Sequence, residues 1–492
     1  MLRFRDIATR GTWDSDQGHD MLTWLAMIRD GTIPLLGPPT SIGDFHHGAL
    51  YYYILAPAAA LGGGEAPVAV VAGIAVAGTA AVAVTWWLAR AIGGPIAAFL
   101  AALLLAVSAA AIEGSTFIWN PNLIAFSAAV TLACTWHARH GGGPRWWLGA
   151  AVGAAVTMQC HVLGTILLPV IAASWLMELR ARPTGAPRAA VLRAGAGGLL
   201  IIVVSYVPLM VNELTSGFAE TNAVLDYVRT GGVGSSLDPL SRLLVVGLRT
   251  TAWPLIGLFI DALPAAVAAA ALVGASAILR SRGAPTAERS GARWLSGALV
   301  WSILALTVGA ASLTTVVRAL PVDHYHAFVD PIVIVIAGLG IAAAYRRNIL
   351  GRAAAVVVTT VLVAWNLMVA PPSISPDGGY PAAARAAERV LAVAGDRPVA
   401  LVGLPDFKPT DGLLYPLTIK GANIVGSDSP SLPGDALIVV LCDGRFDEAI
   451  GASCGGPAED QVAVGGDLVD RFEAHPSRWV SIYAPAAVTA VS

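Results

Sequence analysis

The side chains of this chain that could perform acid–base chemistry are concentrated near its N-terminus. Asp14, Asp16, His19 and Asp20 fall within the short segment Trp-Asp-Ser-Asp-Gln-Gly-His-Asp. A carboxylate held beside a hydroxyl group can act as a general base. The alternative is a solvated loop in which Asp16 caps a helix that begins near Gln17. Because the remainder of the chain avoids charge, we predict that Asp14 and Asp16 are catalytic. His19 and Asp20 are predicted to bind substrate.

Histidines and tyrosines follow in a second segment, at 43–53, which reads Gly-Asp-Phe-His-His-Gly-Ala-Leu-Tyr-Tyr-Tyr. The tyrosines are typical of an aromatic belt at a membrane interface, although such a belt does not explain the histidine pair. His46 and His47 could bind zinc together with His19 and an aspartate. Adjacent histidines lack the i, i+4 spacing of common zinc ligands, so zinc is the weaker interpretation. Tyr52 is the tyrosine that we predict to contact substrate.

A third polar segment, at 113–122, lies between two apolar runs. Pro121 would stand at the start of the following helix with Asn120 as its cap, and this structural role alone would explain the segment. Trp119 and the amides of Asn120 and Asn122 are also suited to contacts with a sugar or a lipid. We predict that these three residues bind substrate.

A fourth segment brings Arg318, His324 and Tyr325 together shortly before an apolar run. Its cationic side chains could hold a phosphate through charge-assisted hydrogen bonds. The alternative, which we weigh equally, is an ordinary polar loop in which Tyr325 is an interface anchor. The sequence has no Walker A loop, GxSxG elbow, HExxH or CxxC motif, which argues against an ATP-driven machine or a zinc protease.

The composition indicates what kind of scaffold must position these segments. Of the 492 residues, 56% are hydrophobic and 13% are charged, whereas soluble domains have about 45–50% and about 25%. This excludes a soluble enzyme for most of the chain, and also a disordered or nucleic-acid-binding protein. The net charge of −2 gives no reason to expect a polyanionic partner. The apolar residues form long runs, which excludes a porin-like barrel and predicts an all-α, multi-span membrane bundle.

The apolar runs predict the individual membrane spans. Two short amphipathic stretches, near 19–30 and 49–62, precede them. The predicted spans are 66–89, 95–112, 122–139, 146–161, 162–179, 194–212, 262–281, 294–315, 328–345 and 352–370. The fourth and fifth are separated at 159–161, because Gln-Cys-His suits an interface better than a bilayer centre. We interpret 239–261, which two arginines and a proline interrupt, as a helix lying at the interface.

The arginines orient the bundle. If the 66–89 span runs from outside to inside, the loops on the inner side carry the highest density of arginines. This distribution is the one that the positive-inside rule requires. Up to residue 370, Glu178 and Glu288 are then the acidic residues that fall inside. The candidate chemistry therefore lies on the outer face. The domains predicted are an external first loop at 1–65, the spans at 66–370 and an external domain at 371–492.

The external C-terminal domain has a mixed pattern that predicts a small α/β fold. A helix is expected at 380–394 and strands at 398–404, 436–442 and 478–484. Since the outside is oxidising, Cys442 and Cys454 could form a disulfide. Two free thiols are an equally weighted alternative.

The topology leaves the N-terminus outside with no preceding span or signal peptide to carry it there. Either one N-terminal helix is missing from this sequence, or the predicted count is wrong by one. We favour the missing helix, so about 10–11 transmembrane helices are expected.

At these residues the sequence resembles the GT-C class of membrane glycosyltransferases, in particular the lipid A aminoarabinose transferases and protein O-mannosyltransferases. Asp16-Gln17 falls where that class has an Asp-Glu pair in the first external loop. The His46-His47-Gly48 segment with its tyrosines falls where a Lys-Pro-Pro-Leu-Tyr-like element is expected, and His324-Tyr325 resembles a late Arg-Tyr element. The departures are Gln for Glu, for which Asp14 would compensate, and histidines in place of a lysine.

The resemblance implies transfer of a sugar from a polyprenyl-phosphate donor to a glycan, lipid or protein acceptor. The reaction would take place at the outer face of a bacterial plasma membrane and would invert the anomeric centre. Asp16 would be the general base. The leaving phosphate would be held by cationic side chains, namely Arg318, His324, His46 and His47. No cofactor is required, although a divalent cation at Asp14 and Asp16 is an alternative.

Two other classes of function compete with this interpretation. A transporter or lipid flippase would need charged groups near the bilayer midplane, broken helices and often an inverted repeat. The sequence shows no repeat and almost no charge within the predicted spans. A non-catalytic scaffold for envelope assembly would not need the acidic first loop. The sequence does not indicate which sugar or which acceptor is used.

Overall fold

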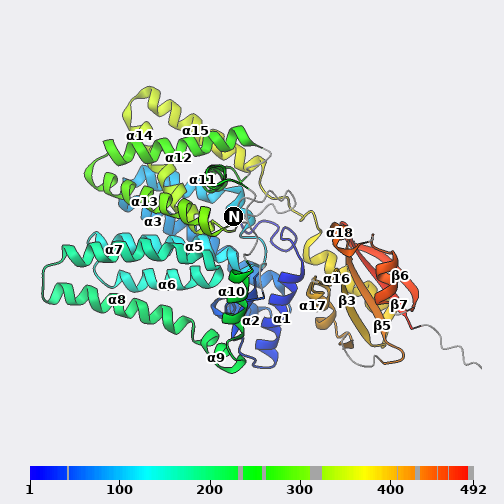
Figure 1. Cartoon of the computed structure of the whole chain (residues 1–492). Coiled ribbons are helices and arrows are strands. Elements are labelled where there is room, and N and C mark those ends of the chain that lie inside the picture. Colours follow the sequence, from blue (N-terminus) through cyan, green and yellow to red (C-terminus); the bar gives the residue numbers. More distant parts are fainter. Residues whose placement is uncertain are drawn as a thin grey trace, which may run out of the picture.

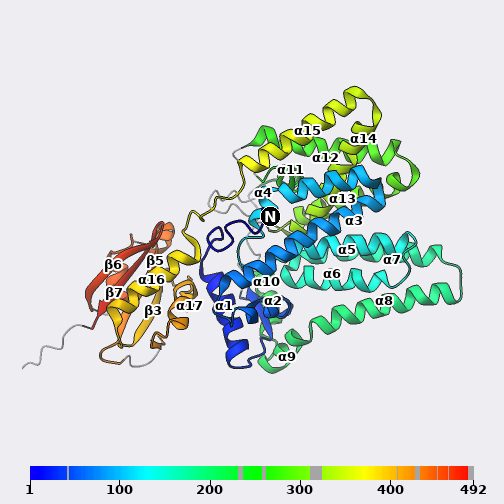
Figure 2. The same cartoon turned by 180° about the vertical axis from the view of Figure 1, so that it is seen from behind.

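The computed structural model describes residues 1–40, 44–230, 237–257, 262–310, 324–406, 408–426, 433–451, 453–463 and 465–485. Figures 1 and 2 show a bundle of long helices with a small sheet domain at one end, beside helix α1. The turn between α7 and α8 lies at the opposite end of the bundle. The predicted combination of a helical bundle and a small C-terminal α/β domain is confirmed.

Within the described residues, seven helices are long and apolar enough to cross a membrane. They are α3 (Pro67–Val107), η2 with α7 (Val162–Leu167 and Leu168–Ala181), α8 (Ala186–Ser205), α12 (Leu263–Gly283), α13 (Thr286–Gly309), η4 with α14 (Ala327–Val329 and Asp330–Arg347) and α15 (Ile349–Met368). Two shorter helices, α5 (Ile124–Arg139) and α6 (Trp146–Cys160), pack against each other beside them.

Helix α3 consists of two helices joined at a kink. Gly94 has a φ of 79°, which a helix cannot accommodate, and Pro95 then starts the second arm. The two arms carry the predicted runs 66–89 and 95–112. Counting the arms separately and including α5 and α6 gives the ten helices that the apolar runs predict.

The boundaries of two predicted spans are wrong. The run expected at 194–212 ends within a separate helix, α9 (Val207–Ser216), while its main helix α8 begins at Ala186. Helix α13 likewise begins at Thr286 rather than 294, and residues 311–315 lie outside the described part of the chain. Arginines occupy the first turns of both helices, where long cationic side chains can reach water from a helix end.

Burial distinguishes the central helix from the outer ones. In η4 and α14, 78% of the apolar window is buried inside the protein, against 17% in α8 and 17% in α15. The central helix contacts α3, α12 and α15. Its apolar residues are therefore core, whereas those of α8 and α15 face the surroundings of the bundle, as lipid-facing helices do.

The two acidic residues predicted to lie inside are both paired with arginines. Glu288 lies between Arg280, at 2.8 Å, and Arg346, at 3.0 Å. Arg346 also donates to the backbone oxygen of Gly93, beside the α3 kink. Glu178 pairs with Arg182 one helical turn away. Glu288 thus ties the ends of three helices together, and Glu178 pairs within the end of α7.

Short elements connect the spans at the end that carries the sheet domain. The two predicted amphipathic stretches form α1 (Ser15–Arg29) and α2 (Leu50–Leu61), with the antiparallel strands β1 (Leu36–Pro39) and β2 (His46–Gly48) between them. The predicted helix at 239–261 is α11 (Pro239–Ile256). The remaining short elements are α4 (Ala109–Glu113), η1 (Asn120–Leu123) and α10 (Ala219–Arg229).

The C-terminal domain is a five-stranded mixed sheet in the order β4-β3-β5-β7-β6. The predicted helix and strands are α16 (Gly379–Ala394), β3 (Val399–Leu404), β5 (Leu437–Asp443) and β7 (Arg478–Ala484). Strands β4 (Ile424–Val425) and β6 (Asp467–His475) and the helices α17 (Asp411–Ile419), α18 (Asp447–Ile450) and α19 (Pro457–Val462) were not predicted. The short turn η5 (Gly444–Phe446) follows β5. Helix α17 packs against α1.

Candidate active site

The N-terminus of α1 is built by a capping box. Asp14 accepts from the backbone N–H of Ser15 and the Gln17 side chain accepts from the N–H of Asp14. The other end of the Gln17 amide donates to the backbone oxygen of Ile118 at 2.8 Å. Gln17 therefore has a structural role. The alternative in which Asp16 caps this helix is wrong, because Asp14 is the cap.

Asp14 is also surrounded by cations of the C-terminal domain. Its carboxylate pairs with Arg478, and the side chains of Lys408 and Arg445 lie at 3.9 Å and 3.8 Å. A divalent cation shared by Asp14 and Asp16 does not fit this arrangement, because the Asp14 oxygens are occupied by the cap and by Arg478.

Asp16 lies in the first turn of α1 with its carboxyl open to solvent. The protein around it and the neighbouring charge of Asp14 raise its pKa, while Lys408, His19 and a hydrogen bond from Trp119 act in the opposite direction. An accessible carboxyl with a raised pKa is the property that a general base requires near neutral pH.

A cluster of aromatic rings lies between the loops that join the helices. The ring centroids of His47 and His161 are 5.4 Å apart, those of His161 and His324 are 5.2 Å apart, and Tyr325 contacts both His161 and His324. Trp119 packs edge-on against His324 at 4.3 Å. Trp119 also interacts with Asp16. The cluster therefore joins the predicted general base to residues from each of the other three polar segments.

Two imidazoles of this cluster, those of His47 and His161, favour the neutral form because burial lowers their pKa values. Burial, followed by the neighbouring His46, lowers the pKa of His47 to about 4. The Nδ1 atom of His161 accepts from the backbone N–H of Leu163 at 3.2 Å, which leaves Nε2 to carry the proton. These rings can donate hydrogen bonds to an anion without being cations.

His161 is a site residue that the sequence analysis missed. It appeared there as part of the polar interruption at 159–161 and was used to separate two spans. The neighbouring Gln159 fixes the same region: its Oε1 accepts from the N–H of Leu50 and its Nε2 donates to Ser205. A Cβ atom at Gly48 would lie 2.3 Å from Gln159 Oε1, so this close approach requires glycine. The Gln-Cys-His triplet inside an apolar run was the feature of the sequence that could have identified His161 as a site residue.

Several residues predicted to bind substrate are engaged within the protein. Asp20 is 1% exposed and accepts from the hydroxyls of Tyr51 and Tyr52. Asn120 donates to the backbone oxygen of Cys160 at 2.6 Å, and Asn122 to that of Phe117 at 2.8 Å. These hydrogen bonds thus stabilise the structure around the site, and they involve Asp20, Tyr52 and the two asparagines.

Two further histidines lie beside acidic residues. His46 donates its backbone N–H to Glu220 of α10 at 2.7 Å, and its Nδ1 lies 3.0 Å from the same carboxylate. His19 Nδ1 lies 3.2 Å from Asp411 of α17. Arg318, the remaining predicted phosphate ligand, lies outside the described residues.

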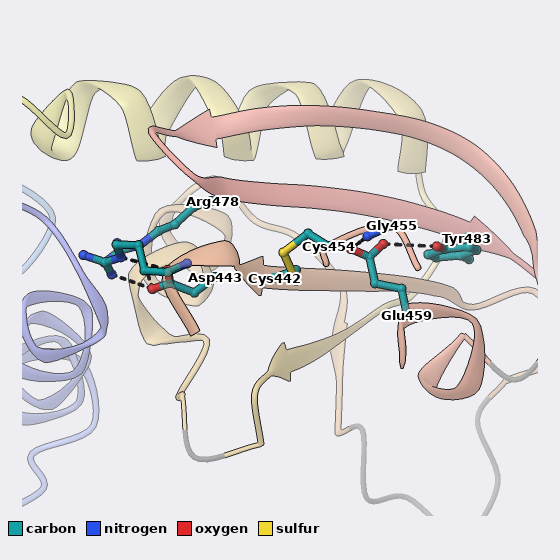
Figure 3. Close-up of a disulfide and its surroundings, with 8 residues drawn as sticks. Cys442, Asp443, Cys454, Gly455, Glu459, Arg478 and Tyr483 are labelled. Carbon is teal, nitrogen blue, oxygen red and sulfur yellow. Dashed lines mark hydrogen bonds and ion pairs between the residues drawn. A yellow bond between two sulfur atoms is a disulfide. The ribbon is translucent and has the colours of Figure 1, made fainter. Parts of the chain in front are cut away.

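The two cysteines of the C-terminal domain form a disulfide, with an S–S distance of 2.03 Å. Figure 3 shows it beside Glu459, which accepts from Gly455 and Tyr483. In the described part of the chain, Cys442, Cys454 and Glu459 form the group with metal-ligand atoms within 4.8 Å of one another. Because both sulfurs are oxidised, this group is not a metal site.

The comparisons with known proteins concern the fold of the chain. Residues 46–207 match the family model described as dolichyl-phosphate-mannose-protein mannosyltransferase. The structure of ArnT from Cupriavidus metallidurans bound to undecaprenyl phosphate superposes with a TM-score of 0.60, at 14% identity, over 98% of this chain and 96% of that one. The chain has the fold of the GT-C glycosyltransferases.

Other structures with the GT-C fold match as well. Apo ArnT from the same organism gives a TM-score of 0.59 at 13% identity, over 98% of this chain and 95% of that one. The oligosaccharyltransferase AglB from Archaeoglobus fulgidus, in complex with an inhibitory peptide and a dolichol-phosphate, gives 0.52 at 11% identity, over 96% of this chain and 70% of that one. No curated protein sequence matches the chain significantly. The helices and the fold together make this a multi-pass membrane protein.

Proposed function

We propose that the protein is a membrane glycosyltransferase that transfers a sugar from a polyprenyl-phosphate donor to an acceptor hydroxyl. The observation that carries this proposal is the position of Asp16. Its accessible carboxyl stands beside Trp119 and the histidine cluster, at the end of a helical bundle with the GT-C fold. The ArnT and AglB structures named above hold undecaprenyl phosphate and dolichol-phosphate, and this supports a lipid-phosphate donor.

In the proposed reaction, Asp16 is the general base. The acceptor oxygen forms a bond to the anomeric carbon while the bond from that carbon to the phosphate oxygen breaks. The acceptor proton passes to the Asp16 carboxylate, and the polyprenyl phosphate leaves with the bonding electron pair. A single displacement of this kind inverts the anomeric centre. The raised pKa of Asp16 favours proton acceptance in the transition state.

The leaving phosphate is proposed to lie at the histidine cluster. The Nε2–H of His161 and the ring of His324 supply hydrogen-bond donors there, and buried donors of fixed orientation stabilise developing negative charge strongly. Arg318 is proposed to add a cation. Trp119, between this cluster and Asp16, offers a face for stacking on the sugar.

We further propose that the site faces the extracytoplasmic side of a bacterial plasma membrane. The distribution of arginines supports this orientation. The Cys442–Cys454 disulfide also supports it, because such bonds persist in oxidising compartments. A nucleotide-activated sugar is scarce on that side, which favours a lipid-carried donor. No metal is required in this mechanism.

The test uses the full chain purified in detergent and reconstituted in nanodiscs. Undecaprenyl-phosphate-linked hexose and pentose with a labelled sugar serve as donors, and release or transfer of the label is measured. Wild-type protein is expected to release the sugar from one of these two donor types. Asp16→Asn is expected to bind the lipid but not to release its sugar. Asp226→Asn, which alters an exposed carboxylate on α10, is the matched control. Full activity of Asp16→Asn would overturn the assignment of the base. Lipid translocation without sugar release would favour a flippase.

A further inference from the structure

The C-terminal domain places a carboxylate directly against the helix that carries the proposed base. Asp411 is the first residue of α17, and its Oδ2 lies 3.2 Å from Nδ1 of His19 on α1. His19 follows Asp16 by three residues, so the two side chains share one face of the helix. A line of contact therefore leads from the C-terminal domain to the site.

We propose that Asp411 is a positioning residue for the transfer reaction: it holds His19 as an imidazolium, whose positive charge keeps Asp16 ionised and ready to accept a proton. The inference rests on the proposed function. It assigns to the soluble domain a role in the acid–base chemistry and extends the site beyond the first loop.

Close backbone packing fixes this contact. A Cβ atom at Gly18 would lie 2.1 Å from the backbone oxygen of Asp411, and one at Gly412 would lie 3.0 Å from the carbonyl carbon of Asp14. Trp13 donates its indole N–H to the oxygen of Gly412 at 2.8 Å. Glycine at both positions lets α1 and α17 approach closely. This close packing fixes the position of His19 relative to Asp411.

The charges around His19 and Asp16 act in consistent directions. The hydrogen bond with Asp411 is the largest effect on His19 and raises its pKa; burial opposes it, while Asp20 and Asp16 add to it. At Asp16, the nearby protein, which displaces part of the water around the carboxyl, and the charge of Asp14 disfavour the ionised form. His19, Lys408 and Trp119 favour it. If Asp411 lost its charge, His19 would become neutral at a lower pH, and Asp16 would lose one of its three stabilising partners.

An ordinary interdomain ion pair would give a different result from a positioning pair. The measurement is kcat/KM for sugar release from labelled undecaprenyl-phosphate-hexose, or the pentose if that is the donor used, between pH 5 and pH 9. Wild type is compared with Asp411→Asn, Asp411→Glu and His19→Gln. Glu388→Gln is the matched control, because it breaks a carboxylate–cation pair with Lys420 elsewhere in the same domain.

Asp411→Asn is expected to move the acidic limb of the profile upward by about one pH unit, which is a tenfold loss at a fixed pH on that limb. Activity at the alkaline plateau should be retained. His19→Gln should give the same shift, the double variant no further shift, and Asp411→Glu should restore the wild-type profile. Glu388→Gln should leave the profile unchanged.

The two proposals fail in different ways. If wild type releases sugar, Asp16→Asn does not, and Asp411→Asn lowers activity equally at every pH, Asp411 is only structural and this inference is wrong. A lower melting temperature together with such a uniform loss would overturn it in the same way. If wild type binds the donor and releases no sugar, the proposed function itself fails.

Discussion

Arg478 on β7 forms an ion pair with Asp14 at the N-cap of α1, although the two residues are 464 positions apart in the sequence. The same guanidinium lies 3.2 Å from Asp443 at the end of β5. One buried cation therefore joins the sheet of the C-terminal domain to the helix that carries Asp16.

Replacing Arg478 by Met is expected to destabilise the protein by about 2–3 kcal/mol. Breaking a buried pair costs about 3–5 kcal/mol; the lower figure allows for the partial exposure of Asp14 and for Arg445, which still pairs with Asp443. Denaturant unfolding in detergent, followed by tryptophan fluorescence, measures the change in the free energy of unfolding. Arg389→Met, which breaks an exposed pair with Asp470, should have little effect. Equal effects of the two variants would contradict this prediction.

The buried carboxyl of Asp20 predicts a dependence of stability on pH. Burial raises its pKa to about 7, against the hydrogen bonds from Tyr52 and Tyr51. Because the folded pKa exceeds the unfolded value, the protonated form is favoured in the native state. The stability it contributes is complete below about pH 4 and is lost as the pH rises to about 7.

Asp20→Asn should abolish this part of the dependence while keeping an acceptor for one tyrosine. Melting temperatures of the wild type should fall between pH 4 and pH 7 relative to those of the variant. Asp226→Asn, at an exposed position, serves as the control. Parallel melting curves for wild type and Asp20→Asn across this range would show that Asp20 does not titrate there.

His161→Gln should lower kcat for sugar release by about a hundredfold with little change in KM. The reason is that a fixed donor to the leaving phosphate acts mainly in the transition state. Steady-state kinetics with labelled donor give both constants. His140→Gln is the control, since His140 follows α5 at the opposite end of the bundle and bonds to the backbone oxygen of Trp136. A loss confined to KM would place His161 in binding alone.

Removal of divalent metal should leave transfer unchanged. Asp14 is committed to the helix cap and to Arg478, so it does not offer a cation the pair of carboxylates that binding would need. Activity is measured after dialysis against EDTA and again after addition of Mg²⁺, Mn²⁺ or Zn²⁺. Loss of activity with EDTA and recovery with one metal would require a different arrangement of Asp14.

Much of the fold can be predicted because its signals are local. Apolar runs of sufficient length give most spans, and short runs rich in β-forming residues in the C-terminal domain give β3, β5 and β7. Strand β6 was not predicted because most of its residues are exposed or half-buried and polar. The start of α8 was not predicted because arginines in its first turns are also typical of a loop.

The site is less predictable, because its assembly depends on distant contacts. The sequence singles out Asp16, Trp119 and His324, but it does not show that they meet. The internal hydrogen bonds of Asp20 and Asn120 were not foreseen for the same reason: polarity is visible in a sequence, whereas a buried hydrogen-bond partner is not. His161 was hidden inside an apolar run.

The contact between the C-terminal domain and α1 also bears on when the N-terminus of α1 can reach its final structure during synthesis. Strand β7, which supplies Arg478, follows α1 and the described membrane spans in the chain, so it is translated after Asp16. The ion pair at the N-terminus of α1 can therefore form only after β7 has been made. A chain inserted in the bilayer but not yet extended through β7 would carry the proposed base without Arg478 beside Asp14, so activity should begin only after β7 has been made.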